Sequence, residues 1–143
     1  GNTRAARAAD EVTYHDADKD SPYRMNVARM DSHGGWLATP SDMVRFALHV
    51  DGFKTTPNIL RAETIATMST ASAANANYAC GWSVNRFGNW WHMGSLPGLN
   101  TVMVRTHSEL CWAAFTNTRT KEIGLALDQL VWKLAAAVPA WKA

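Results

Sequence analysis

The apolar residues between Tyr78 and Phe115 repeat with a period of two, and this repeat restricts the fold more than any other feature. Side chains that alternate in this way point to opposite faces of a β-strand. The intervening segments are short and rich in Gly, Asn and Pro, as in hairpin turns. The sequence therefore predicts an antiparallel sheet of about four strands. The expected strands are Tyr78–Val84, Trp90–Gly94, Thr101–Arg105 and Leu110–Phe115, with Ser95–Gly98 as the second turn.

A helix start precedes the predicted sheet at residues 39–42 (TPSD). Thr39 can cap the free N–H groups, proline suits the first helical position, and Asp42 can reach back to the cap residue. The residues that follow are apolar at helical spacing, and Asp51-Gly52 stops the helix. The expected apolar face consists of Met43, Phe46, Ala47 and Val50.

Two further helices are expected, one over Arg61–Met68 and one at the end of the chain, from near Thr120 to Pro139. The last helix has apolar residues at helical spacing, which are Ile123, Leu127, Leu130 and Leu134. Helices before the sheet and a C-terminal helix packed on it make an α+β fold. The length of 143 residues fits a single domain over residues 1–143.

Residues 1–33 predict an irregular lead-in, because they contain many acidic and turn-forming residues and little apolar periodicity. We interpret the acids of this segment as a solvated face. They are Asp10, Glu11, Asp16, Asp18 and Asp20. The chain begins with Gly1 rather than Met, which suggests a cut or processed product, and its polar first residues do not form a signal peptide.

Composition and charge exclude several classes of protein. Hydrophobic residues make up 47% of the chain and charged residues 18%, which is enough apolar material for a core. The net charge of +2 comes from scattered residues, so no nucleic-acid partner is expected. No apolar run approaches the roughly 20 residues that span a bilayer.

Cys80 and Cys111 each lie in a strand-like apolar run, where we expect small core side chains rather than a disulfide. Neither C-x-x-C nor H-E-x-x-H is present, so neither a metal nor another cofactor is expected. The tryptophans, including Trp36, Trp82 and Trp112, are interpreted first as core residues.

The stretch WWHMGSLPG at residues 90–98 contains the candidate catalytic residues His92, Gly94 and Ser95. Alternation puts His92 and Gly94 on one face of a strand, and Gly94 leaves room for a close approach to the backbone. An imidazole beside free backbone N–H groups can transfer protons and bind an oxyanion. The alternative is that His92 is a structural histidine in a Trp-rich strand.

Three segments together resemble the β-lactamase and penicillin-binding-protein family of serine hydrolases, most closely its class C β-lactamases and related esterases. They are residues 34–46 (GGWLATPSDMVRF), residues 78–82 (YACGW) and residues 92–98 (HMGSLPG). The last of these is similar to the H-x-G form of the family's third motif. With the terminal helix, the resemblance covers most of residues 31–137.

The resemblance implies acyl transfer through a serine, on an ester, amide or β-lactam substrate, in a bacterial periplasmic or secreted enzyme. His92 then takes the place of the motif's lysine, Gly94 keeps the strand open to substrate, and the N–H of Ser95 is one oxyanion donor. Family members usually carry Thr or Ser where this chain has Met93. That difference, with His in place of Lys, favours an esterase or peptidase over an efficient β-lactamase.

The family's nucleophile motif is missing, since no serine of this sequence has a lysine three residues later and no Tyr-x-Asn occurs. The chain is therefore expected to be the C-terminal part of a larger catalytic domain and to be inactive by itself. Its expected partners are the N-terminal half of that domain or a second copy paired at an open sheet edge. The alternative is a non-catalytic α+β module that binds a ligand at its Trp-rich strand.

Overall fold

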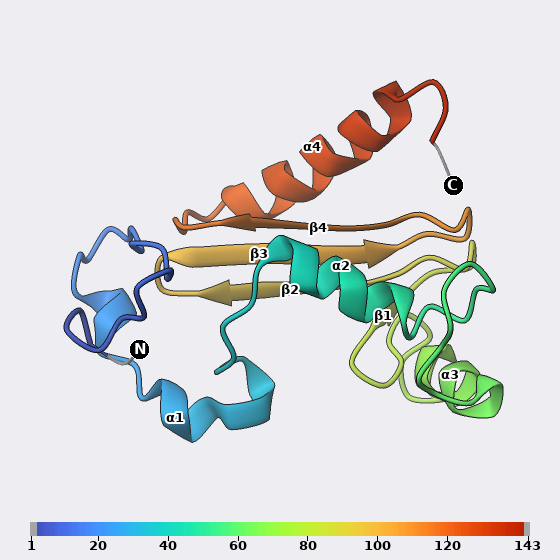
Figure 1. The fold of residues 1–143 in the computed structure, drawn as a ribbon, viewed down its shortest axis with the longest axis horizontal. Coiled ribbons are helices and arrows are strands. Elements are labelled where there is room, and N and C mark those ends of the chain that lie inside the picture. The colour runs from blue at the N-terminus through green and yellow to red at the C-terminus, as the bar shows by residue number, and fades with distance from the viewer. Residues whose placement is uncertain (1–2, 142–143) are drawn as a thin grey trace. The chain divides into compact units, whose positions relative to one another are not determined.

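The computed structural model describes residues 3–141 and has an α+β fold, which confirms the predicted class (Figure 1). Its helices are α1 (Val27–Met30), α2 (Pro40–Leu48), α3 (Ala62–Ser69) and α4 (Ile123–Ala137), with 3-10 turns η1 (Ser21–Tyr23) and η2 (Asp31–His33). Its strands are β1 (Ser83–Val84), β2 (Trp90–Leu96), β3 (Leu99–Arg105) and β4 (Cys111–Thr116). They form an antiparallel sheet in the order β1-β2-β3-β4.

Strand β1 is shorter than the alternation predicts, because it covers Ser83–Val84 and not Tyr78–Val84. Gly81 has a φ of +81°, a left-handed conformation that glycine adopts without steric cost and that interrupts an extended strand. The chain therefore turns here, and Tyr78 forms an isolated bridge with Ser83. Cys80 lies in this turn and is exposed, so its expected place in the core is wrong.

Strand β2 is longer than predicted and continues to Leu96. The expected turn Ser95–Gly98 is therefore wrong in its first two residues, and the turn consists of Pro97 and Gly98 alone. Proline fixes φ at the first central position, and Gly98 supplies the positive φ of +73° that the second position requires. Ser95 thus lies on the strand that also contains His92 and Gly94.

The described residues divide into two compact units, which are treated in turn. One contains the residues up to Ala38, Met93–Thr101 and the residues from Ala114 onward. The other contains Thr39–His92 and Val102–Ala113.

The unit that begins at Thr39 opens with the predicted capping box of α2. The N–H of Asp42 donates to Thr39 Oγ1 at 3.1 Å, and the N–H of Thr39 donates to Asp42 Oδ2 at 3.0 Å. Both groups would otherwise be free N–H donors at the helix start. The helix buries Ala47, but Phe46 is 45% exposed, so its predicted place on the apolar face is wrong.

The core of this unit joins α2 and α3 to sheet residues. The rings of Trp82 and Trp90 meet edge to face with centroids 5.0 Å apart, the preferred geometry for an aromatic pair. The cluster of buried residues consists of Ala47, Ile65, Trp82, Val84, Trp90 and Met103. Cys111 is partly buried against this cluster, as predicted.

In the other unit, the packed face of α4 differs from the predicted one. Its partly buried apolar side chains are Ile123, Leu127, Val131 and Ala135. Leu130 and Leu134 are 51% and 57% exposed, so their assignment to the packed face is wrong. Gly124 marks the packed side, because a Cβ there would lie 3.4 Å from Asn100 Oδ1 and 3.5 Å from Met93 Cε.

The lead-in segment packs on the β2–β3 turn rather than forming only a solvated face. The side chain of Asp16 is 9% exposed, so the interpretation of this acid as solvated is wrong. Trp36 is 78% exposed, and its predicted place in the core is also wrong. None of the helices within residues 3–141 has the length and apolar character needed to cross a membrane.

Candidate active-site strand

Strand β2 is paired along only part of one edge. Strand β1 contacts it through Ser83 opposite Trp91 and Val84 opposite Trp90. Past Trp91, nothing within residues 3–141 pairs with this edge of β2. The second half of β2 is therefore unpaired, within the described residues, on the side away from β3; this side is called the open edge below.

The register shows which backbone groups of β2 face the open edge. The N–H of Val84 donates away from β2, to Asn77 O at 3.0 Å, so Ser83 and its partner Trp91 turn their backbone groups toward each other. Backbone groups on an antiparallel strand alternate between its two neighbours. The N–H groups of Met93 and Ser95 consequently face the same side as that of Trp91, at the open edge.

The side chains predicted for the site are accessible. His92, Met93 and Ser95 are exposed on β2, and within residues 3–141 the His92 ring makes no hydrogen bond. Gly94 has no spare room, because a Cβ there would lie 2.5 Å from Thr101 Oγ1. The Thr101 hydroxyl thus fills the place beside Gly94 that a side chain would take. Sequence reasoning did not single out Thr101, since a β-branched residue in a strand is ordinary.

The turn that ends β2 is fixed by a residue that the motifs did not identify. Asp16 Oδ2 accepts a hydrogen bond from the N–H of Gly98 at 2.8 Å, and lies 3.1 Å from Nε of Arg119. The Gly98 hydrogen bond, with the charge of Arg119, holds the pKa of the Asp16 carboxyl below its usual value. The acid is thus ionised at neutral pH and acts as an acceptor.

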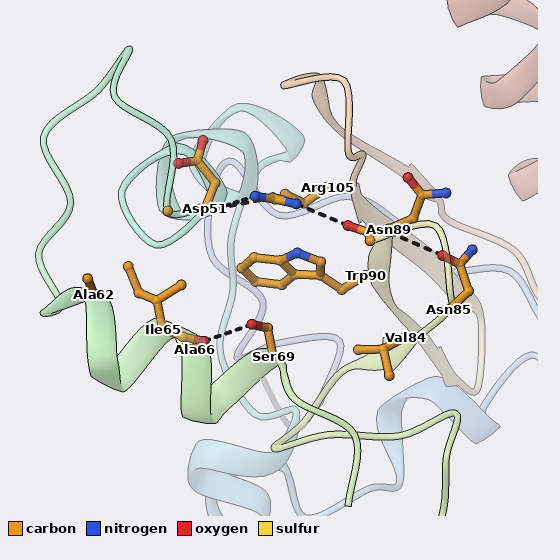
Figure 2. A pocket seen from close by; sticks show the side chains of 12 residues that line it. Asp51, Ala62, Ile65, Ala66, Ser69, Val84, Asn85, Asn89, Trp90 and Arg105 are labelled. Carbon is orange, nitrogen blue, oxygen red and sulfur yellow. Dashed lines mark hydrogen bonds between the residues drawn. The ribbon is translucent and has the colours of Figure 1, made fainter.

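A separate hollow of about 350 Å³ lies beside Trp90 in the unit that begins at Thr39. Figure 2 shows Ile65 and Ser69 of α3 on one side of the Trp90 ring and Arg105 above it. The guanidinium of Arg105 lies 3.7 Å from the centroid of the Phe53 ring and 4.9 Å from that of Trp90.

The polar groups of this hollow already have partners within the chain. Arg105 donates to the main-chain oxygens of Asp51 and Gly88. Asn89 Oδ1 accepts from the N–H of His107 at 2.8 Å, and Ser69 Oγ donates to Ile65 O. These hydrogen bonds hold the polar side chains of the hollow in place. Partial burial is the main reason that the pKa of Arg105 is lowered.

Metal-ligating and thiol groups do not form a centre in the described part of the chain. Residues 3–141 contain no group of three or more His, Cys, Asp or Glu side chains arranged to hold an ion. Burial, and then the charge of Asp51, raise the pKa of the Cys111 thiol to about 11. This thiol is therefore protonated and unreactive at neutral pH.

The chain thus combines an α+β fold with a strand that carries His92, Gly94 and Ser95 beside a sheet edge left unpaired within residues 3–141. A protein-family model described as Beta-lactamase matches residues 1–136. The chain belongs to the β-lactamase family. The match includes residues 1–33, which carry none of the motifs that suggested the family. No curated protein and no solved structure matches the chain.

Proposed function

We propose that this chain forms one wall of an active site for acyl transfer, in which the N–H of Ser95 donates to the oxyanion. The observation that carries the proposal is the open edge of β2 beyond Trp91, where the register turns the N–H of Ser95 outward. A backbone donor fixed in a strand needs no reorganisation as negative charge develops, and such donors contribute strongly to catalysis.

His92 is proposed as the proton-transfer group of this wall. Its side chain is exposed on β2, at the first residue after Trp91, where the pairing with β1 ends. Imidazole changes its charge near neutral pH, which suits general acid–base catalysis. In the resemblance to the family, His92 stands where the third motif has lysine.

The nucleophile is proposed to lie outside this sequence. No serine among the 143 residues has lysine three residues later, and no Tyr-x-Asn occurs. We propose that an N-terminal half of the catalytic domain supplies both motifs and that this chain alone does not turn over substrate. Strand β4, the outer strand opposite β1, offers that half an edge for pairing. Without it, the edge favours self-association.

The substrate is proposed to be an ester or a peptide rather than a β-lactam. The side chain of Met93 points toward α4, since its Cε lies 3.5 Å from the Cβ that Gly124 would carry. It has no hydroxyl to hold a substrate carboxylate. His92 binds a carboxylate less strongly than lysine does at neutral pH.

A fluorophosphonate probe followed by intact-mass measurement tests the location of the nucleophile. The chain alone is expected to give no adduct, and a mixture with an N-terminal half that carries S-x-x-K is expected to give one adduct on that half. A stoichiometric adduct on Ser95 of the isolated chain would show that the mechanism is wrong.

The role of His92 is tested in the assembled enzyme with an activated ester such as p-nitrophenyl acetate. His92→Ala is expected to lower the acylation rate by about 10²-fold, the usual scale of general acid–base catalysis. His107→Ala, in the exposed β3–β4 turn, is the matched control and should leave the rate unchanged. Equal rates for the two variants would remove His92 from the mechanism.

A second candidate function, binding of a small ligand without catalysis, is favoured by the hollow beside Trp90. Its apolar wall includes Ile65, Val84 and the Trp90 ring, and hollows of this size hold small molecules. A fragment screen that follows tryptophan fluorescence tests it. Saturable binding that Ile65→Trp abolishes would support this function, and no binding by the folded chain would exclude it.

A further inference from the structure

One carboxylate ties together three segments that are far apart in the sequence. Asp16 Oδ2 lies 2.8 Å from the N of Gly98, which is 82 residues away, and 3.1 Å from Nε of Arg119. The Asp16 side chain is 9% exposed, whereas that of Arg119 is 37% exposed. The acid is thus enclosed where the lead-in meets the turn between β2 and β3.

The turn fits closely against the lead-in at this point. A Cβ on Gly98 would lie 2.7 Å from Tyr14 Cβ and 2.9 Å from Pro22 Cγ, closer than such atoms approach each other. The N–H of His15 also donates to Asn117 O at 2.8 Å, so the lead-in is held at the residue just before Asp16 as well. Within this close fit, the N–H of Gly98 donates to the Asp16 carboxylate.

We infer that Asp16 is a positioning residue for the oxyanion donor Ser95. Among residues 3–141, the half of β2 that contains Ser95 pairs with β3 alone, so one of its edges lacks the restraint that a second strand gives. The hydrogen bond from Gly98 to Asp16 holds the end of this half-paired segment, three residues beyond Ser95. Arg119 lies against the same carboxylate oxygen and helps to orient it. The hydrogen bond from Gly98, and then the charge of Arg119, lower the pKa of Asp16 and keep it an acceptor.

The inference rests on the proposed function for the role of Ser95, but it is tested on the isolated chain without turnover. Amide hydrogen exchange and ¹⁵N relaxation are measured by NMR for the unmodified chain, Asp16→Ala and Asp16→Asn. Asp10→Ala is the matched control, since Asp10 is an exposed acid of the same segment. Amides of Val102 and Val104, which are buried in β3, report on the fold.

Asp16→Ala is expected to speed exchange at Gly98 and Leu96 by about tenfold and to increase the backbone motion of Ser95, with Val102 and Val104 unchanged. Asp16→Asn keeps an oxygen acceptor for the Gly98 N–H and is expected to restore most of the protection. If Asp16 only stabilised the fold as a whole, its replacement would change amide exchange uniformly across the chain. Asp16→Asn would then not restore protection selectively at the β2–β3 turn.

Unchanged exchange at Gly98 in Asp16→Ala would overturn the inference, as would uniform loss of protection in both variants. If Asp16→Ala does not fold, Asp16→Asn is the deciding variant. The inference would also be overturned if Asp16→Asn folds but its Gly98 amide exchanges as fast as an unstructured amide. Exchange does not depend on hydrolysis. If the mixture with the N-terminal half gave no probe adduct while the exchange pattern was as expected, the proposed function alone would be refuted.

Discussion

Arg105 donates two hydrogen bonds to a single atom, the main-chain oxygen of Asp51, from Nε at 3.0 Å and from Nη2 at 2.7 Å. Its Nη1 donates to Gly88 O at 3.0 Å, and the guanidinium stacks on Phe53 and Trp90. The planar fork of arginine suits such a combination of stacking and parallel donors, which the ammonium of lysine cannot reproduce. One side chain thus links β3 to the loop after α2 and to the β1–β2 turn.

Arg105→Met is expected to lower the free energy of unfolding by about 2–4 kcal/mol, because it keeps an apolar stem but leaves two main-chain oxygens without donors. Urea unfolding followed by tryptophan fluorescence measures the change. Arg86→Met is the control, since Arg86 is exposed and stacks on the exposed ring of Phe87, and it should change stability by less than about 0.5 kcal/mol. Equal effects of the two variants would contradict the prediction.

Thr39→Ala is expected to destabilise the chain by about 1 kcal/mol, because the helix start then loses the oxygen that accepts from the N–H of Asp42. Thr67→Ala in α3 removes an exposed hydroxyl that donates to Glu63 O within the helix, and it should have little effect. Thermal unfolding by far-UV circular dichroism compares both with the unmodified chain. A Thr39→Ala curve that coincides with the Thr67→Ala curve would show that the cap is not formed.

The two cysteines are expected to react very differently with a disulfide reagent at pH 8. Cys80 is exposed in its turn, whereas the pKa of the partly buried Cys111 is raised to about 11, which leaves on the order of one thiolate in a thousand at pH 8. Peptide mass mapping should find Cys80 labelled in the folded protein and Cys111 labelled only in urea. Fast labelling of Cys111 in a Cys80→Ser chain would contradict its burial.

The same raised pKa makes the alkaline stability depend on Cys111. The folded state favours the protonated thiol, whereas the unfolded thiol ionises near its usual value of 9.0. Its contribution is therefore complete below pH 9 and declines as the pH rises toward 11. Cys111→Ala should flatten this part of the stability curve, measured by urea unfolding at a series of pH values, and an unchanged slope would refute it.

Local patterns predicted the helices and missed the longer-range contacts. The capping box of α2 lies within four consecutive residues, so the sequence alone identifies it. Alternation did not reveal that Gly81 has a left-handed conformation, so β1 was predicted too long. The helical spacing of α4 marks several apolar stripes, and only packing decides that Leu127 turns inward while Leu134 stays exposed.

For the candidate site, too, the sequence predicted the residues that are close together in the chain and missed the one that only the fold brings near. His92, Gly94 and Ser95 lie on one strand, as their spacing suggests, but the strand continues through Ser95, and their catalytic roles stay predictions. Asp16 could not be found in this way, because it resembles the neighbouring acids in sequence. Only the fold brings it to Gly98, 82 residues away.

Gly94→Ala is expected to destabilise the chain by about 1–3 kcal/mol, because its new Cβ would lie 2.5 Å from Thr101 Oγ1. Thr101→Ala removes that oxygen and leaves Thr101 Cβ at 3.8 Å, an ordinary contact. The double variant should therefore recover most of the loss, with a coupling energy of about 1–2 kcal/mol in a double-mutant cycle measured by urea unfolding.

Gly124→Ala separates this steric effect from the general effect of replacing glycine. A Cβ at Gly124 meets its nearest atoms at 3.4 and 3.5 Å, and alanine is the better helix former, so this variant is expected to be neutral or more stable by up to about 1 kcal/mol. If Gly94→Ala were equally harmless, Thr101 would not crowd the strand. The room beside Gly94 would then be open for substrate without any requirement for glycine.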